Sequence, residues 1–204
     1  MVQRITIRAS QKKGDIVELT ANQSHYLRRV LRLGVGDRFI AQDGLGAQWF
    51  ATLSENPTVA HVVEVVAAAQ QVLPTAPLRL IAALPKGNSF DQVVRQATEL
   101  GVSHIYPVIS DRTLLKPKGN RLERWRRISQ EASEQSERIT VPEIFSPMPV
   151  NMCLQQANWK GLRYLCAARQ NSPHLLAKLQ DDLTSENLLD VTLMVGPEGG
   201  WTAD

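Results

Sequence analysis

The stretch that decides the fold is Val191-Thr192-Leu193-Met194-Val195-Gly196-Pro197-Glu198-Gly199-Gly200-Trp201, near the end of the 204-residue chain. An apolar run rich in β-branched residues ends at a loop of three glycines, one proline and one carboxylate. Such a run predicts a buried parallel strand, and open α/β sheets bind ligands at the carboxyl ends of their strands. Glycine lets a ligand approach the backbone, and proline stiffens the turn. We therefore expect a ligand-binding loop here, although an ordinary turn has the same composition.

The overall composition is that of a globular protein, with 43% hydrophobic and 21% charged residues and a formal net charge of +3. No apolar run approaches the roughly 20 residues of a membrane span, and the first residues alternate like a strand rather than a signal peptide. Cys153 and Cys166 belong to no CxxC motif or Cys/His cluster. We therefore expect a cytoplasmic protein with neither a disulfide scaffold nor a metal site.

Residues 1–72 are predicted to form a small β-rich domain that holds one helix. Thr20 and Gln23 have the spacing of a capping box, and Gly34 is expected to end the helix. The 3.6-residue period puts its apolar and basic residues on opposite faces. The apolar set is Leu27, Val30 and Leu31, and the basic set is Arg28, Arg29 and Arg32.

Three strand-like runs follow at residues 38–42, 48–53 and 59–68, and turn signals separate them. Several short strands of this kind predict a small barrel. The sequence Leu-Pro-Thr-Ala-Pro at residues 73–77 is stiff and breaks helices, so we interpret it as the linker to a second domain.

Residues 78–204 alternate between strand and helix patterns, which predicts a mainly parallel sheet with helices on both faces. Strands are expected at 78–84, 104–109, 164–167 and 191–195, and helices at 88–101, 120–141 and 173–179. The residues expected to be buried are Phe90, Val93, Ala97 and Leu100 on the first of these helices, and Trp125, Ile128, Ala132 and Ile139 on the second.

The sequence lacks the common motifs of nucleotide and hydrolase sites. It contains no GxxxxGK[ST], GxGxxG or GxSxG, and its four histidines have no ligand-like spacing. Basic residues cluster instead, with seven Lys or Arg and one acid between residues 112 and 127. Such clustering suits a phosphodiester backbone, and it is equally typical of a solvated helix surface. The seven are Arg112, Lys116, Lys118, Arg121, Arg124, Arg126 and Arg127. With the basic set of the first helix they would give an RNA-binding surface that crosses both domains.

Several segments together resemble one family, the 16S rRNA (uracil-N3)-methyltransferases of the trefoil-knotted SPOUT superfamily. They occur in the family's order from residue 25 to the last loop, and their agreement in register is far more specific than any one of them. The segments are His25–Arg32, Lys86-Gly87 with Ala97–Val102, Arg124-Trp125 with Glu131–Gln135, Arg138 with Val141-Pro142, and Gly196–Gly200.

The resemblance implies a PUA-like RNA-binding barrel followed by a SPOUT methyltransferase domain that works as a homodimer. It implies S-adenosylmethionine as the methyl donor and a uridine in the decoding region of the small ribosomal subunit as the acceptor. The residues expected to hold the donor are Val195, Gly196, Pro197, Glu198, Gly199 and Gly200, with Ala168 in a more loosely matching second loop. The RNA-contact candidates are Arg28, Arg29, Arg32, Lys86, Arg112, Lys116, Lys118, Arg121, Arg124, Arg127 and Arg138.

The catalytic candidates are Glu198 and Arg169. Uridine N3 is a weak imide acid that must lose its proton before it attacks the sulfonium methyl, so direct transfer depends on alignment. Glu198 has two possible roles, to take that proton or to orient the loop by hydrogen bonding. Arg169 or Arg112 is the candidate to stabilise negative charge at O2 or O4 of the base.

The family's chain continues beyond a position like Asp204 with a helix, a strand and an arginine-bearing loop that complete the knot. Thr202 is predicted to be the N-cap of that helix. We therefore expect an incomplete knot, weak donor binding and no activity in these 204 residues alone. Two alternatives stay open: a non-catalytic RNA-binding or ribosome-assembly module, and a SPOUT methyltransferase that acts on another RNA.

Overall fold

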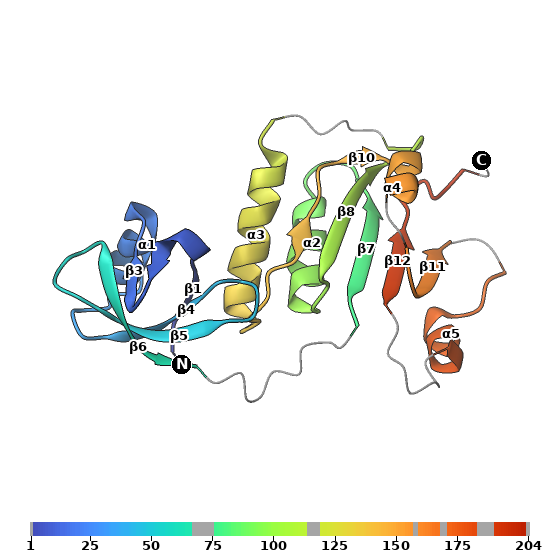
Figure 1. The fold of residues 1–204 in the computed structure, drawn as a ribbon. Helices are drawn as coiled ribbons and strands as arrows, with labels where there is room; N and C mark the ends of the chain where they lie inside the picture. Colours follow the sequence, from blue (N-terminus) through green and yellow to red (C-terminus); the bar gives the residue numbers. More distant parts are fainter. Residues whose placement is uncertain are drawn as a thin grey trace. The chain divides into compact units, whose positions relative to one another are not determined.

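The chain forms two compact units, each built on a six-stranded sheet (Figure 1). The computed structural model describes residues 2–66, 76–113, 119–156, 159–167, 171–182 and 190–202. Unit 1 contains Met1–Gln71 and Ser133–Val141, and unit 2 contains Val72–Ala132 and Pro142–Asp204.

Unit 1 is a curled sheet closed around a core of aliphatic residues and Phe39. Its strands are β1 (Arg4–Thr6), β2 (Lys12–Lys13), β3 (Ile16–Glu18), β4 (Arg38–Gln42), β5 (Gln48–Leu53) and β6 (Val59–Val65), in the order β1-β4-β5-β6-β3-β2. A short 3-10 turn, η1 (Ala9–Gln11), follows β1. The β-rich first domain predicted from the sequence is confirmed.

The helix of unit 1 begins where the capping box predicts and ends differently. The Gln23 N–H donates to Thr20 Oγ1 at 3.2 Å, and the Thr20 N–H donates to Gln23 Oε1 at 2.9 Å. α1 (Ala21–His25) then passes into η2 (Tyr26–Val30), a π-helix. The wider turn of a π-helix rotates Val30 off the apolar stripe, and its side chain is 58% exposed. The prediction that Val30 shares the apolar face of Leu27 and Leu31 is therefore wrong. The chain leaves the helix at Arg32, which has a φ of 59°, and not at Gly34.

The segment Ser133–Val141 completes unit 1. Gln42 is fully buried, and its Nε2 atom donates to Ser133 Oγ and to the Arg138 carbonyl, both at 3.2 Å. Nearby, the Thr6 N–H donates to Glu134 Oε1 at 2.6 Å. The sequence predicted one helix through this region. That prediction is wrong, because the helix ends at Gln135 and a positive φ at Glu137 redirects the chain.

Unit 2 is a parallel sheet, as predicted. Its strands are β7 (Leu78–Ala83), β8 (His104–Ile109), β9 (Glu143–Ile144), β10 (Met148–Pro149), β11 (Leu162–Cys166) and β12 (Val191–Val195). Their order is β10-β8-β7-β12-β11, and β9 also pairs with β8. The helices are α2 (Phe90–Glu99), α3 (Arg121–Gln135), α4 (Val150–Gln156) and α5 (Leu175–Asp182). The predicted trefoil knot stays a prediction.

Helices cover both faces of this sheet. α2 and α3 pack on one face, where the Phe90 and Trp125 rings lie 4.6 Å apart, and α4 packs on the other face through Cys153. One predicted detail of α2 is wrong. Leu100, which was expected to be buried, is 76% exposed because it is the C-cap, where the chain turns back toward β8. Val94, which was not among the predicted buried residues, is fully buried.

The topology fixes where a ligand is expected. β7 lies at the centre, the chain first adds β8 on one side of it, and it later inserts β12 on the other side. The strand order therefore changes direction between β7 and β12, and such a switch point is the usual ligand site of an open α/β sheet. In the described part of the chain, no helix is both long and apolar enough to span a membrane.

Candidate active site

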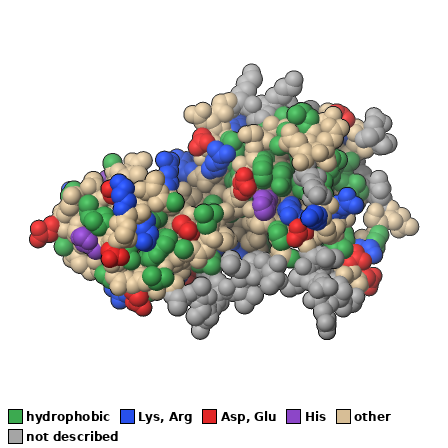
Figure 2. All heavy atoms as spheres, in the orientation of Figure 1, with side chains coloured by type: hydrophobic (Ala, Val, Ile, Leu, Met, Phe, Trp, Pro, Cys, Tyr) green, Lys and Arg blue, Asp and Glu red, His purple; other side chains and the backbone are tan. Residues whose placement is uncertain are grey.

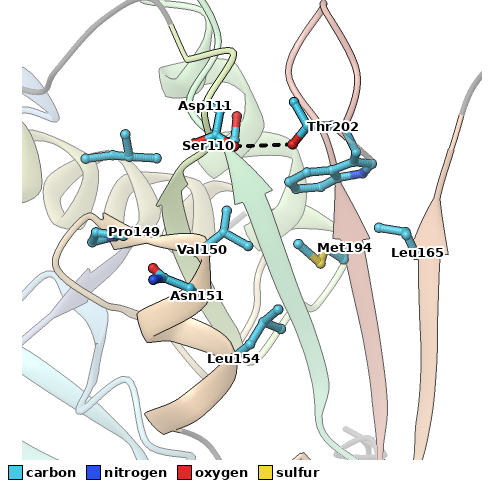
Figure 3. Close-up of a pocket in the computed structure, with 11 residues that line it drawn as sticks. Ser110, Asp111, Pro149, Val150, Asn151, Leu154, Leu165, Met194 and Thr202 are labelled. Atoms are coloured by element: carbon cyan, nitrogen blue, oxygen red, sulfur yellow. Dashed lines mark hydrogen bonds between the residues drawn. The ribbon is translucent and has the colours of Figure 1, made fainter. Parts of the chain in front are cut away.

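A pocket of about 480 Å³ lies in unit 2, at the carboxyl ends of the strands (Figure 3). This volume is within the range of about 300–1,000 Å³ that small-molecule sites usually have. Its walls combine apolar side chains with a few polar groups. The lining residues are Ile109, Ser110 and Asp111 after β8, Pro149, Val150, Asn151 and Leu154 in β10 and α4, Leu165 in β11, Met194 in β12, and Trp201 and Thr202 after β12.

The glycines of the loop after β12 are needed by the protein's own packing. A Cβ at Gly196 would lie 3.1 Å from the Trp201 indole, and a Cβ at Gly199 would lie 3.2 Å from Arg112 Cδ. Gly200 has a φ of 73° and its N–H donates to the Pro197 carbonyl at 2.8 Å, which closes a tight turn. Since a larger residue would be crowded at Gly196 or Gly199 and strained at Gly200, the glycines let the loop lie close against Trp201 and Arg112.

Side chains tie the same loop to the neighbouring strand ends. Glu198 Oε1 accepts from the Lys86 N–H after β7 at 3.1 Å, and Arg112 Nη1 after β8 donates to the Gly199 carbonyl.

Two further bonds follow in the chain. Thr202 Oγ1 lies 3.2 Å from Asp111 Oδ2, and Trp201 Nε1 donates to the Cys166 carbonyl at 3.3 Å. The loop and the residues after it are therefore joined to the ends of β7, β8 and β11.

The Glu198 carboxylate is solvent-exposed and is held in its charged form. Its own backbone N–H and that of Lys86 donate to the carboxylate and lower its pKa below the ordinary 4.5, and the Lys86 charge acts in the same direction. A carboxylate with a lowered pKa is a weak proton acceptor at neutral pH. It remains a good hydrogen-bond acceptor for the two backbone N–H groups.

Family models match most of the chain. A model described as an RNA methyltransferase domain matches residues 72–204, and one described as an RNA methyltransferase PUA domain matches residues 19–63. The chain belongs to the RNA methyltransferase family. This confirms the family and the fold class predicted from the motifs.

Known members of this family match over nearly the whole chain. The ribosomal RNA small subunit methyltransferase E of Synechocystis is 42% identical over 205 residues, which cover 99% of this chain and 66% of that protein. The enzyme of the same name from Rickettsia conorii is 26% identical, over 98% of this chain and 80% of its own length. The chain thus spans just under two thirds of the Synechocystis relative.

A solved structure of the same kind of enzyme also aligns with the whole chain. The crystal structure of a ribosomal RNA small subunit methyltransferase E from Neisseria gonorrhoeae, bound to S-adenosyl methionine, aligns with a TM-score of 0.82 and 26% identity. The alignment covers 100% of this chain and 83% of that one.

The residues predicted to hold the donor lie next to two lining residues in the chain. Met194 and Trp201 line the pocket, and the six predicted residues lie between them in the chain without lining it: Val195, Gly196, Pro197, Glu198, Gly199 and Gly200. Ala168 and Arg169 lie outside the described residues. The wall formed by α4 was not predicted from the sequence. Its only signal was a short apolar spacing of Val150, Cys153 and Leu154, and no motif marked it as functional.

The predicted RNA-contact residues near α3 are largely engaged within unit 2. Arg124 pairs with Asp91 at 2.6 Å, and Arg121 Nη1 donates to the Gly87 carbonyl at 3.3 Å. Arg126 and Arg127 pair with glutamates of the same helix. Figure 2 shows acidic side chains beside the basic ones over α3. Lys86 is exposed, and Lys116 and Lys118 lie outside the described residues.

The three arginines of the first helix divide into two kinds. Arg28 is half-buried, and its Nη2 donates to the Ser54 carbonyl at 2.8 Å. The side chains of Arg29 and Arg32 are exposed and form no hydrogen bond or ion pair within the described part of the chain. Arg138 belongs to the segment that completes unit 1, and its carbonyl accepts from Gln42 and Ser133. An RNA surface that draws on both units stays a prediction.

Metal ligands do not gather anywhere in the described ranges, where no three His, Cys, Asp or Glu side chains form a group able to hold an ion.

Proposed function

We propose that this chain carries the methyltransferase activity that its relatives' names state, the S-adenosylmethionine-dependent methylation of small-subunit ribosomal RNA. The observation that carries the proposal is the pocket of about 480 Å³ beside the tied glycine loop, at the switch point of the sheet. The Neisseria gonorrhoeae relative, which was crystallised with S-adenosyl methionine, supports the choice of donor. From the motif resemblance we infer N3 of a uridine as the acceptor atom.

The pocket has the chemistry that this donor requires. Leu154, Leu165 and Met194 offer apolar walls for a nucleoside, and Asp111 offers a negative charge for an ammonium or sulfonium group. The backbone groups of Gly196–Gly200 would complete the binding site at its edge. When bound, the donor supplies an electrophilic methyl on a sulfonium sulfur.

We assign Glu198 to orienting the loop rather than to taking the N3 proton. Its carboxylate already accepts two backbone N–H groups, and those bonds lower its pKa. Arg112 is likewise engaged, since it donates to the Gly199 carbonyl. Of the two candidates, Arg112 and Arg169, only Arg169 therefore remains to stabilise the negative charge at O2 or O4 of the base. The N3 proton passes to solvent water first. The N3–methyl bond then forms as the sulfur–methyl bond breaks, and the electron pair of the broken bond stays on the sulfur as a neutral thioether.

The remaining features of the proposal follow from the resemblance. The substrate is 16S rRNA within the small subunit, the working form is a homodimer, and the reaction takes place in the cytoplasm. The PUA family match supports RNA binding by unit 1. A catalytically silent RNA-binding module is the competing interpretation.

A methyl-transfer assay separates these interpretations. Because the chain spans 66% of the Synechocystis relative, two forms are assayed: the chain as it stands, and an extended chain joined at Asp204 to the matching C-terminal segment of that relative. Each form is incubated with S-adenosylmethionine and unmethylated 16S rRNA in small subunits, and the digested RNA is analysed by mass spectrometry. We expect N3-methyluridine with the extended chain. RNA binding by both forms without methyl transfer by either would favour the silent module.

A further inference from the structure

The end of the first helix in unit 1 has an unusual backbone. Among the described residues, only Arg32 and Glu137 adopt a positive φ without being glycine, at 59° and 58°. Arg32 occupies the position after the helix C-cap, where glycine is preferred because a Cβ is strained there. An arginine at this position costs stability that a glycine would not.

The two left-handed residues differ in what their side chains do. Glu137 forms an ion pair with Arg4 at 3.2 Å inside unit 1, so its conformation serves an internal contact. Arg32 is exposed and has no hydrogen bond or ion pair within the described residues. Within the described part of the chain, no hydrogen bond or ion pair of the Arg32 side chain offsets that strain.

The preceding turn presents a second guanidinium in the same way. The π-helix Tyr26–Val30 leaves Arg29 exposed and Val30 58% exposed, while Arg28 is bonded to the carbonyl of Ser54. π-Turns are rare, and they occur frequently at functional sites. Two local irregularities thus leave Arg29 and Arg32 free beside an exposed apolar side chain.

We propose that Arg29 and Arg32 form a phosphate-binding site for the backbone of the substrate RNA. A guanidinium binds phosphate through two parallel N–H donors, and a group without an internal partner loses no existing bond when it does so. Arg28 is not part of the site, and its role is to hold the helix against the loop between β5 and β6. The site rests on the proposed function, because it names where that RNA is held.

The test is RNA affinity at several salt concentrations, measured by fluorescence anisotropy with the 204-residue chain and a labelled stem-loop from the decoding region of 16S rRNA. Arg29→Ala and Arg32→Ala should each weaken binding by about tenfold, the cost of one charged hydrogen-bonded contact. Each should also reduce the slope of log affinity against log salt by about 0.7–0.9, because one phosphate contact is lost. The matched control is Arg38→Ala, an exposed arginine of unit 1 that already pairs with Glu64. It should bind like wild type.

Arg32→Gly separates binding from folding. Glycine removes the strain at φ 59°, so this variant should resist urea better than wild type while losing as much RNA affinity as Arg32→Ala. Arg32→Lys keeps the charge and should retain most of the salt slope.

Unchanged affinity and slope in both alanine variants would overturn the site and leave the proposed function intact. Failure of the wild-type chain to bind the stem-loop would overturn the site and count against RNA as the substrate.

Discussion

The loop after β12 in unit 2 and the helix end in unit 1 use similar residues in opposite ways. At the loop, Glu198 and Arg112 are both exposed, yet each side chain forms a hydrogen bond to a backbone group. Glu198 accepts from the Lys86 N–H, and Arg112 donates to the Gly199 carbonyl. At the helix end, Arg29 and Arg32 have no partner within the described residues. Both regions resemble solvated turns in the sequence. The difference teaches that the role of a charged side chain near a site depends on its partners. A charge that is already hydrogen-bonded holds a loop in place, whereas a charge without a partner is available to a ligand.

The largest expected effect comes from removing the ring that supports the donor loop. Trp201 packs against Gly196, lines the pocket and donates to the Cys166 carbonyl. Trp201→Ala in the extended chain should weaken S-adenosylmethionine binding by about 30-fold, equivalent to about 2 kcal/mol for a half-buried aromatic side chain. Calorimetric titration measures this. Trp201→Phe keeps most of the packing and should lose only a few-fold, and donor affinity unchanged in Trp201→Ala would separate the loop from donor binding.

A smaller effect is expected from the engaged arginine of the loop. Arg112→Ala frees the Gly199 carbonyl and should weaken donor binding by about tenfold, the value of one charge-assisted hydrogen bond. RNA affinity should change much less. Arg126→Ala is the matched control, because Arg126 makes only a surface pair with Glu123. Equal donor losses in both variants would mean that net charge, and not the contact, sets donor affinity.

Within unit 1 the comparison predicts opposite results for adjacent arginines. Arg28→Ala removes a half-buried bond to the Ser54 carbonyl and should lower the free energy of unfolding by about 1–2 kcal/mol. Its salt slope for RNA should equal that of wild type. Arg29→Ala should reduce that slope by about 0.7–0.9 and keep the stability of wild type. Urea denaturation and anisotropy measure the two quantities, and a change of slope in Arg28→Ala would place that residue in the RNA site.

The smallest expected effect is that of pH on donor affinity. The pKa of Glu198 is lowered below 4.5 by two backbone N–H groups, so its contribution to the loop is complete above 4.5 and is lost only as pH falls through the lower value. Titration of Glu198 should therefore leave donor affinity unchanged between about pH 6 and pH 9, a range far above the pKa of a carboxyl group. Glu198→Gln should keep the pH dependence of methyl transfer, because an amide oxygen also accepts from N–H. A flattened pH profile in this variant would return Glu198 to the role of base.

Much of the fold is predictable because its elements are periodic. β4, β5, β8 and β12 have the predicted bounds, since each is a continuous apolar or alternating run between turn signals. The two-residue strands β9 and β10 are too short to carry a period, and they were missed. The wall formed by α4 was missed with them.

The sequence indicated where in the sheet the candidate site would lie, but not the role of each of its side chains. The glycine loop identified the strand end, but the engagement of its charges depends on contacts between residues far apart in the sequence. Glu198 and Lys86 are one example, and Arg124 and Asp91 are another. The π-turn at Tyr26–Val30 was not anticipated either, because its residues also fit an ordinary helical period.

The most direct test measures the affinity for the donor and for RNA in variants of the loop after β12 and of the helix end in unit 1. Dissociation constants for S-adenosylmethionine and for the decoding-region stem-loop are determined with the extended chain, for wild type, Glu198→Ala and the double variant Arg29→Ala/Arg32→Ala. We predict that Glu198→Ala weakens only the donor and that the double variant weakens only the RNA. A double variant that loses the donor, or a Glu198→Ala chain that loses RNA while keeping the donor, would contradict the division between engaged and free charges.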